Sequence, residues 1–233
     1  MNPLLVTDDR LFVLTGAGVS AESGLATFRG SGGLWNGYRV DQVATPEAWQ
    51  ADPLLVWQFY SMRRRDALAA EPNTAHRALA ALEQRLGDRF YLCTQNVDDL
   101  HERGGSVRVH HMHGSLFDSR CMRCDTPFAD RNFYETAADL PRCADCGEAV
   151  RPHIVWFGEV PLDMDGIYRQ LDRATVVLVV GTSGSVYPAA GFVQIANQRG
   201  IRTVYVGPEE PLNAEVFDDV VLGTATEVLQ RLL

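Results

Sequence analysis

Short apolar runs that end at glycine or polar turns recur along the chain. They are Leu11–Thr15, Phe90–Thr94, Ala174–Val180 and Arg202–Val206, and all are rich in branched or aromatic side chains. Runs of this length, bounded by turn residues, predict buried strands. The segment 174–180 is apolar almost throughout, which is typical of a central parallel strand that is covered on both faces.

Helical spacing appears between these runs. The segment 74–86 carries apolar residues three and four positions apart, with Asn73 placed to cap its first turn and Gly87 to end it. Ala189–Arg199, followed by Gly200, predicts a second helix. Strand, polar turn and helix alternate, and this order predicts an α/β fold: a Rossmann-like parallel sheet with helices on both faces and ligands at the carboxyl ends of its strands.

Two stretches interrupt this alternation. The region from Gly30 to Glu71 reads as helical, and Cys121–Val150 holds paired cysteines. We therefore expect a single domain over 1–233 with three parts. These are a larger Rossmann-like part from 1–29, 72–117 and 151–233, a helical insertion at about 30–71, and a small zinc-ribbon module at about 118–150.

Four cysteines form two Cys-x-x-Cys pairs, Cys121 with Cys124 and Cys143 with Cys146. Two such turns bring four thiolates around one Zn²⁺, and the 18 residues between the pairs fall within the zinc-ribbon range. Sulfur at all four positions leaves no open coordination site, so we predict one structural zinc per chain. A redox site would need only one pair, and a secreted disulfide framework would be shorter and richer in cysteine. Cys93, inside an apolar run, is predicted to be a buried packing residue.

Composition and charge narrow the classes of protein. Hydrophobic residues make up 46% of the 233 positions, but no run of about 18 apolar residues occurs, so we expect no membrane-spanning helix. The formal net charge is −9 without a basic tract, which argues against direct nucleic-acid binding. Residues 1–10 lack the basic and apolar regions of a secretory signal. Together with zinc-binding thiolates, these features favour a cytoplasmic protein.

The first polar turn, residues 16–21, has the sequence Gly-Ala-Gly-Val-Ser-Ala and fits the G-x-G-x-x-G/A pattern of dinucleotide-binding proteins. Glycines there permit a tight turn and close approach of the backbone to a pyrophosphate. The pattern is weak by itself, because any strand-to-helix turn can use two glycines. A dehydrogenase would continue into a second strand that ends in an acidic residue. Here Thr27–Trp35 is a glycine-rich loop that could fold over the nicotinamide end of a cofactor, so hydride transfer is disfavoured.

Six motifs follow one another along the chain: Gly16-Ala-Gly-Val-Ser-Ala-Glu-Ser-Gly24, Thr27-Phe-Arg29, Thr94-Gln-Asn-Val-Asp98, His111-Met-His-Gly114, the paired Cys-x-x-Cys and Gly181-Thr-Ser183. In this order, from Leu11 to about Leu222, they resemble the sirtuins, NAD-dependent protein lysine deacylases. Ala26–Arg29 and Tyr60–Arg63 resemble the bacterial-type class III branch, which favours acidic acyl groups such as succinyl or malonyl. The resemblance implies an enzyme that removes acyl groups from lysine side chains and yields nicotinamide and O-acyl-ADP-ribose.

The resemblance also implies roles for polar residues near the second strand. His113 matches the family's general base, which acts on a ribose hydroxyl, and a histidine suits this task because its pKa lies near neutrality. Asn96, grouped with His113 as catalytic, and Asp98 match the residues that hold the nicotinamide amide, and Gln95 should lie near the ribose. Asn and Asp are also common where strands end, so turn chemistry is the alternative reading.

The other NAD-binding residues that the resemblance implies lie on the remaining turns. Many sirtuins place an asparagine after the strand 202–206, where this chain has Gly-Pro-Glu, so we expect backbone contacts to the adenosine ribose and somewhat reduced affinity for NAD. The expected NAD-binding residues are Gly16, Ala17, Gly18, Ser20, Glu22, Ser23, Thr27, Phe28, Arg29, Trp35, Gln95, Asn96, Asp98, His113, Gly181, Thr182, Ser183, Gly207, Pro208, Glu209 and Ala225.

Tyr60 and Arg63 are implied to select the acyl group. On a helix they share one face, and an arginine fork with a phenol can bind a carboxylate. The plain alternative is that 63–65 forms a solvated basic face; with the resemblance, we assign solvation to Arg64 and Arg65, and also to Asp99. The expected substrate-contacting residues are Tyr60, Arg63, Val155, Phe157, Gly158, Glu159 and Val186.

Two other functions use the same features. A protein ADP-ribosyltransferase on this fold would share the NAD site but needs no carboxylate clamp, and a non-enzymatic NAD sensor needs no general base. Both are therefore disfavoured by the residues present. Acylated lysine-containing proteins are the expected partners, a monomer is expected, and His110 and His111 stay unassigned.

Overall fold

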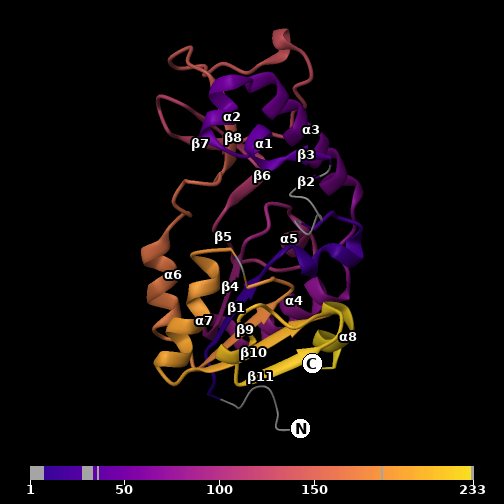
Figure 1. The fold of residues 1–233 in the computed structure, drawn as a ribbon, viewed down its shortest axis with the longest axis vertical. Coiled ribbons are helices and arrows are strands. Elements are labelled where there is room, and N and C mark those ends of the chain that lie inside the picture. Colours follow the sequence, from indigo (N-terminus) through magenta and orange to yellow (C-terminus); the bar gives the residue numbers. More distant parts are fainter. Residues whose placement is uncertain (1–7, 28–33, 36, 185, 232–233) are drawn as a thin grey trace.

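The computed structural model describes residues 8–27, 34–35, 37–184 and 186–231. Its main sheet has six parallel strands in the order β11-β10-β9-β1-β4-β5 (Figure 1). The strands are β1 Leu11–Thr15, β4 Phe90–Thr94, β5 Val109–His111, β9 Val176–Val180, β10 Arg202–Gly207 and β11 Asp219–Leu222. Strand order reverses beside β1, with β4 and β5 on one side and β9 to β11 on the other. A doubly wound sheet binds its ligands at such a reversal, and the predicted α/β fold is confirmed.

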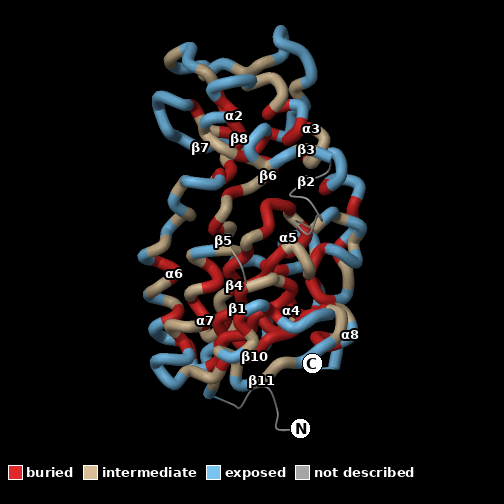
Figure 2. The backbone as a smooth tube through the Cα atoms, in the orientation of Figure 1, coloured by how far each residue is buried: buried red, intermediate tan, exposed pale blue. Residues whose placement is uncertain are grey.

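Helices cover both faces of this sheet, as the alternation of side chains along β1 shows. Leu11 and Val13 join one core cluster with residues of α4 and α8, whereas Phe12 and Leu14 join a second cluster with residues of α6 and α7. The four helices are α4 Thr74–Leu86, α6 Met164–Leu171, α7 Ala189–Gln198 and α8 Ala225–Gln230. Buried residues run along the strands of this sheet (Figure 2). The sheet is therefore held from both sides by apolar contact.

The predicted caps of α4 are present. Asn73 accepts hydrogen bonds from the backbone N–H groups of Ala75 and His76 at 2.9 and 3.4 Å, so it satisfies donors that the first helical turn leaves open. Gly87 ends the helix with φ +56°, a conformation that favours glycine. Residues 74–86 were predicted from the spacing and caps, and both bounds are correct.

Two edge strands were not predicted from the apolar runs. β5 has only three residues, two of them histidine, and β11 begins with an aspartate and is partly exposed. Edge strands are covered on fewer sides and need fewer apolar residues, so the search for continuous apolar runs passes over them. Of the predicted strands, β1 and β4 have the expected bounds and β9 begins two residues later than expected.

A second part of the chain lies above the carboxyl ends of the main sheet (Figure 1). Its helices pack against a three-stranded antiparallel sheet of order β7-β6-β8, and a shared core joins Trp57 and Tyr60 to Leu116 and Val150. The elements are β2 Leu34–Trp35, β3 Tyr38–Arg39, α1 Val40–Val43, α2 Pro46–Ala51, α3 Pro53–Ala69, β6 Gly114–Cys121, β7 Pro127–Ala129 and β8 Val150–Ile154. Among the helices of the described residues, none combines the length and the apolar character needed to cross a bilayer.

The prediction that Arg64 is solvated is wrong. Its side chain is 0% exposed and lies in an ion pair with the equally buried Asp130 at 3.3 Å. The guanidinium also donates to the carbonyl oxygens of Leu116 and Asn132 and to Ser119 Oγ. Position 64 falls one turn after Tyr60, on the buried face of α3, so the helical period was a better guide than the run of three arginines. Arg65, one position on, has a side chain that is 47% exposed, as predicted.

Removal of the Arg64 side chain should destabilise the fold strongly. Arg64→Ala leaves Asp130 buried without its cation, and loss of one partner of a buried pair costs about 3–5 kcal/mol. The neighbouring Arg65→Ala is the matched control and should change the free energy of unfolding by less than about 0.5 kcal/mol, as is usual for an exposed position. Equilibrium denaturation of both variants measures the difference. Equal small effects would mean that the Arg64–Asp130 pair does not hold α3 against the segment that follows β7.

Candidate functional site

A cavity of about 680 Å³ opens where the main sheet meets the second part of the chain. This volume is typical of sites for small molecules and cofactors. The turns that follow β1, β4 and β9 contribute to its wall, together with α3 and the segment after β8. Predicted site residues in the wall are Gly16, Ala17, Gly18, Ser20, Thr27, Tyr60, Arg63, Gln95, Asn96, Asp98, His113, Val155, Phe157, Gly158, Glu159, Gly181, Thr182, Ser183 and Val186.

The glycines of the first turn let two turns touch. A Cβ placed on Gly18 would lie 2.7 Å from both the Cα and the carbonyl oxygen of Gly181, and one on Gly16 would lie 2.9 Å from the Gly181 oxygen. The N–H of Gly18 donates to that oxygen at 2.8 Å. Side chains at either position would push the turns apart, so the glycine spacing is required for the shape of the cavity wall.

Ser20 joins the two residues expected to hold the nicotinamide amide. Asn96 Nδ2 donates to Ser20 Oγ at 3.1 Å, and Ser20 Oγ donates to Asp98 Oδ2 at 3.3 Å. His76 completes the group, with its Nε2 3.4 Å from Ser20 Oγ. The backbone N–H of Asn73 donates to His76 Nδ1, so Nε2 carries the ring proton. His76 was not predicted, and its position on the buried face of α4 was the signal available in the sequence.

Asp98 is buried, and burial raises its pKa from the usual range, although the N–H of Leu100 donates to its carboxylate and opposes the rise. The ionised carboxylate is a strong hydrogen-bond acceptor, but its burial away from water costs free energy. The prediction that its neighbour Asp99 is solvated needs correction, because only 15% of that side chain is exposed. Asp99 pairs with Arg103 and Arg131 at 3.6 and 3.3 Å.

His113 follows β5 and lies in the cavity wall. Its Nδ1 is 3.2 Å from the carbonyl oxygen of Gln95, which only accepts, so Nδ1 carries the proton and Nε2 has a free lone pair. Burial lowers the pKa of His113, although the Gln95 carbonyl opposes this. The ring is therefore neutral at physiological pH and can accept a proton at Nε2.

His111 supports the same turn from the outside. Its Nδ1 is 2.9 Å from the carbonyl oxygen of Asn96, and its Nε2 is 2.8 Å from a carboxylate oxygen of Glu102. Burial acts to lower the pKa of His111, but Glu102 and the Asn96 carbonyl outweigh it and the pKa is raised. His110 lies on the other side of β5, where its Nε2 is 3.2 Å from the carbonyl oxygen of Leu162.

Tyr60 and Arg63 both reach the cavity from α3. Tyr60 is 0% exposed, and its hydroxyl oxygen accepts a hydrogen bond of 3.0 Å from the indole of Trp156. Burial raises the pKa of Tyr60 to about 12, so the phenol stays protonated at neutral pH. Arg63 lies beside the ring of Phe59, and burial lowers its pKa from the usual range, whereas the nearby Tyr60 and Asp98 raise it.

The segment after β8 is fixed at both ends. The N–H of Val155 donates to the carbonyl oxygen of His113 at 2.9 Å, and the N–H of Phe157 donates to that of Ala44 at 3.0 Å. Gly158 has φ +89°, a conformation that favours glycine, in the turn that the N–H of Glu159 closes on the carbonyl oxygen of Trp156 at 2.9 Å. Phe157, which also lies in the cavity wall, is 45% exposed.

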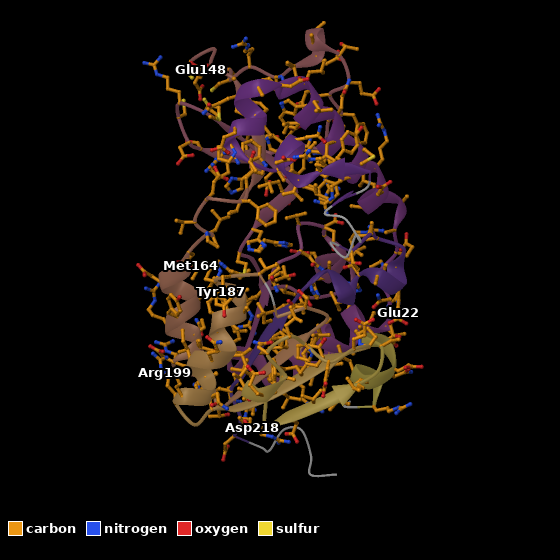
Figure 3. The ribbon with its side chains drawn as sticks, in the orientation of Figure 1. Glu22, Glu148, Met164, Tyr187, Arg199 and Asp218 are labelled. Atoms are coloured by element: carbon orange, nitrogen blue, oxygen red, sulfur yellow. The ribbon has the colours of Figure 1, made fainter. Side chains whose placement is uncertain are left out.

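The residues expected at the adenosine end adjoin the described cavity wall but are not part of it. The carboxylate of Glu22 accepts hydrogen bonds from the N–H and hydroxyl of Thr226, next to Ala225, so it joins the first turn to α8; Figure 3 shows Glu22 beside this helix. Glu22, Ser23, Gly207, Pro208, Glu209 and Ala225 do not appear among the described residues of the cavity wall. Trp35 belongs to β2, while Phe28 and Arg29 lie outside the described residues.

The space beside Gly207 is occupied by the side chain of Tyr205. A Cβ at this position would lie 2.2 Å from the hydroxyl oxygen of Tyr205, whose phenol donates to the carbonyl oxygen of Thr182 at 3.3 Å. The phenol therefore takes the space that a side chain at 207 would occupy, and it supports the turn after β9.

The four paired cysteines converge. Their sulfur atoms all lie within 4.8 Å of one another, with Cys121 and Cys124 each 3.5 Å from Cys146. A tetrahedral zinc with Zn–S bonds of ~2.3 Å needs sulfurs about 3.8 Å apart, so the set fits one Zn²⁺. The N–H groups of Cys124 and Arg123 donate to Cys121 Sγ, and the first of these is the main reason that the pKa of Cys121 is lowered to about 7. Cys93 is buried in the core, as predicted.

A doubly wound sheet with a cavity at its strand reversal, and a four-cysteine site in an inserted module, define a nucleotide-binding α/β protein. The Sir2 family model matches residues 16–188. A protein of Caulobacter vibrioides described as an NAD-dependent protein deacylase is 51% identical over 223 residues, which are 94% of this chain and 93% of that protein. One of Shigella flexneri with the same description is 48% identical over 229 residues, 97% of this chain and 84% of that protein.

Solved structures agree with this match. A complex of a Sir2 homologue with NAD superposes with a TM-score of 0.85 and 44% identity, and it covers 95% of this chain and 87% of that chain. The chain therefore belongs to the Sir2 family, and the predicted resemblance to sirtuins is confirmed.

Loss of one zinc ligand should release the metal and destabilise the fold. The purified wild type should contain one zinc per chain by metal analysis, whereas Cys146→Ser should contain far less and unfold at lower temperature, because the binding energy of a structural site is folding energy. Cys93→Ala is the matched control, since it removes a buried thiol far from the cluster and should keep its zinc. A fully active wild type that has never met a chelator and contains no zinc would refute the structural role.

Proposed function

We propose that this protein is an NAD-dependent protein lysine deacylase that removes acidic acyl groups, such as succinyl or malonyl, as well as acetyl groups. The observation that carries the proposal is the meeting of three sets in one cavity: the Ser20-Asn96-Asp98 group, the neutral His113, and the donors Tyr60 and Arg63. The descriptions of the two close relatives support NAD as the co-substrate and acylated proteins as substrates.

When bound, NAD supplies the ADP-ribosyl group that receives the acyl oxygen, and nicotinamide is released as the nicotinamide–ribose bond breaks. Asn96 and Asp98 would hold the nicotinamide amide, since an amide and a carboxylate match its carbonyl and NH₂ groups. His113 would take a proton at Nε2 from a ribose hydroxyl, and the Gln95 carbonyl holds its ring in the tautomer that this step needs. Backbone groups of the turns at Gly16 and Gly181 would receive the phosphates.

The acyl end of the cavity offers a protonated phenol and a guanidinium. Both donate hydrogen bonds, and charge-assisted bonds to a carboxylate are the strong ones. Without such a carboxylate, a partly desolvated arginine faces a neutral chain at some cost, so acetyl groups should be the weaker substrates. The segment Val155–Gly158 and Val186, all in the cavity wall, would place the backbone of the protein substrate.

A protein ADP-ribosyltransferase is not favoured, because a transferase does not need hydrogen-bond donors at an acyl pocket.

We also propose a reducing cytoplasm as the location, since the five cysteines include four arranged for metal and none in a disulfide.

The proposal is tested with matched acetyl-, malonyl-, succinyl- and glutaryl-lysine peptides, each incubated with NAD and followed by mass spectrometry. Formation of the deacylated peptide, nicotinamide and O-acyl-ADP-ribose in equal amounts, fastest for an acidic acyl group, is the expected result. The chain itself contains no lysine, so it adds no acyl-lysine to the assay. Transfer of ADP-ribose to protein without loss of the acyl group would instead support the transferase.

Replacement of His113 should abolish turnover while the fold persists. His113→Ala should lower kcat/KM about 10²-fold or more, the usual scale for a positioned acid or base. His153→Ala, a histidine outside the described cavity wall, is the control and should retain activity.

The pH profile gives a second check of the same assignment. A lowered pKa keeps His113 in its basic form at neutral pH, so kcat/KM should fall only as the pH drops through a value below about 6.5, the ordinary pKa of histidine. Near-normal turnover of folded His113→Ala protein would contradict its role as the base.

Changes at the acyl pocket should alter selectivity. Tyr60→Phe and Arg63→Met should each lower the ratio of kcat/KM for succinyl-lysine to that for acetyl-lysine, because a charge-assisted hydrogen bond worth about 1.5–3 kcal/mol is lost. The ratio cancels general effects on folding and on NAD binding. Arg65→Met, on the exposed side of the same helix, should leave it unchanged. An equal decline for both substrates would mean that Tyr60 and Arg63 are structural only.

A further inference from the structure

Trp156 lies in the segment Val155–Gly158, which is proposed to hold the substrate backbone, and contacts the proposed acyl pocket. Its side chain is 2% exposed, lies in the cavity wall and belongs to the core that joins α3 to the three-stranded sheet. The indole Nε1–H donates to the hydroxyl oxygen of Tyr60 at 3.0 Å, across 96 positions of sequence. This bond is a direct contact between the segment that should hold the substrate backbone and a residue that should select the acyl group.

The direction of the bond determines what Tyr60 can do. A phenol hydroxyl carries one hydrogen and accepts through its oxygen. Because the indole donates to this oxygen, the hydrogen of Tyr60 must turn away from Trp156. Tyr60 lies in the cavity wall, and its phenol is protonated at neutral pH. A carboxylate in the cavity would meet a donor that is already directed outward, so little rotational freedom is lost on binding.

Trp156 is itself held firmly. The central carbon of the Arg151 guanidinium lies 3.2 Å from the centre of the Trp156 ring. The centre of the Trp49 ring lies 5.9 Å from that of Trp156. The carboxylate of Glu159 accepts from the backbone N–H of Trp156 at 2.8 Å and pairs with Arg151 at 2.6 Å. Glu159 was expected to contact substrate, yet both of its carboxylate oxygens bond within the protein, one to Arg151 and Arg120 and the other to Arg151 and Trp156.

We infer that Trp156 is a positioning residue for acyl selectivity: its indole N–H fixes the hydroxyl of Tyr60 as a donor toward a carboxylate at the end of the acyl chain. The inference rests on the proposed deacylase function and deepens it. Glu159 and Arg151 keep the indole in place, so they act one step further from the substrate. A phenylalanine at 156 would fill most of the same space but would leave the Tyr60 hydroxyl free to rotate.

A double-mutant cycle tests this inference. Trp156→Phe should lower the ratio of kcat/KM for succinyl-lysine to that for acetyl-lysine on the order of 3- to 10-fold, the range expected for one hydrogen bond. In a Tyr60→Phe background, which has no hydroxyl to orient, the same substitution should leave the ratio unchanged. Trp57→Phe is the matched control, since it removes from the same core an indole N–H that bonds to the Val150 carbonyl oxygen instead, outside the described cavity wall, and should leave the ratio at the wild-type value.

Two outcomes overturn the inference alone. One is a ratio that falls equally in the wild-type and Tyr60→Phe backgrounds, and the other is a ratio that Trp156→Phe leaves unchanged although Tyr60→Phe lowers it. A ratio that Tyr60→Phe itself does not lower overturns the proposed acidic-acyl pocket as well. If Trp156→Phe does not fold, 3-benzothienylalanine at position 156 keeps the shape of the indole and replaces its N–H by sulfur, and the same cycle applies.

Discussion

The site depends on the register in which β1 pairs with both of its neighbours. Thr15, the last residue of β1, lies opposite Thr94 of β4 and Val180 of β9, so the three strands end level. The ladder continues one residue into each turn: the N–H groups of Gly16, Gln95 and Gly181 each donate to a carbonyl of the adjacent strand at 2.9–3.0 Å. The polar turns therefore begin side by side at one edge of the sheet, where together they form part of the cavity wall.

Burial of polar groups at this edge carries a cost that the structure offsets locally. Ser20, Asn96 and Asp98 are all nearly buried, and each hydrogen bond among them satisfies a group that water would otherwise serve. His76 on α4 holds Ser20 from behind, and His111 on β5 holds the Asn96 backbone. The amide and the carboxylate are thus oriented before any ligand enters, which reduces the ordering that binding requires.

The sequence predicts the parts of the fold that local chemistry determines. β1, β4 and α4 were predicted with their bounds, because apolar runs and caps act within a few residues, and the four cysteines were recognised from spacing alone. Arg64 was missed because a run of charge was weighed above the helical period.

Other features depend on contacts that no local pattern reveals. Gly207 reflects the phenol of Tyr205, and the group around Ser20 needs His76 from a helix 56 positions away. The pair Tyr60 and Trp156 lies 96 positions apart. The first two contacts form within the main part of the chain and the third within the second part, but each needs the tertiary packing, so local patterns in the sequence give the candidates and not their partners.

The two halves of the cavity are linked electrostatically through Arg63. The charge of Asp98, at the expected nicotinamide end, acts to raise the pKa of Arg63, and the charge of Arg63 acts to lower the pKa of Asp98, although burial dominates both. Such an interaction is strong where water is excluded. In the proposed function, Arg63 would therefore serve both as a donor for an acyl carboxylate and as part of the field that favours the ionised form of Asp98. Because one cation would act on both ends, the proposed acyl selectivity and the proposed binding of nicotinamide would depend on the same charge arrangement rather than on two separate pockets.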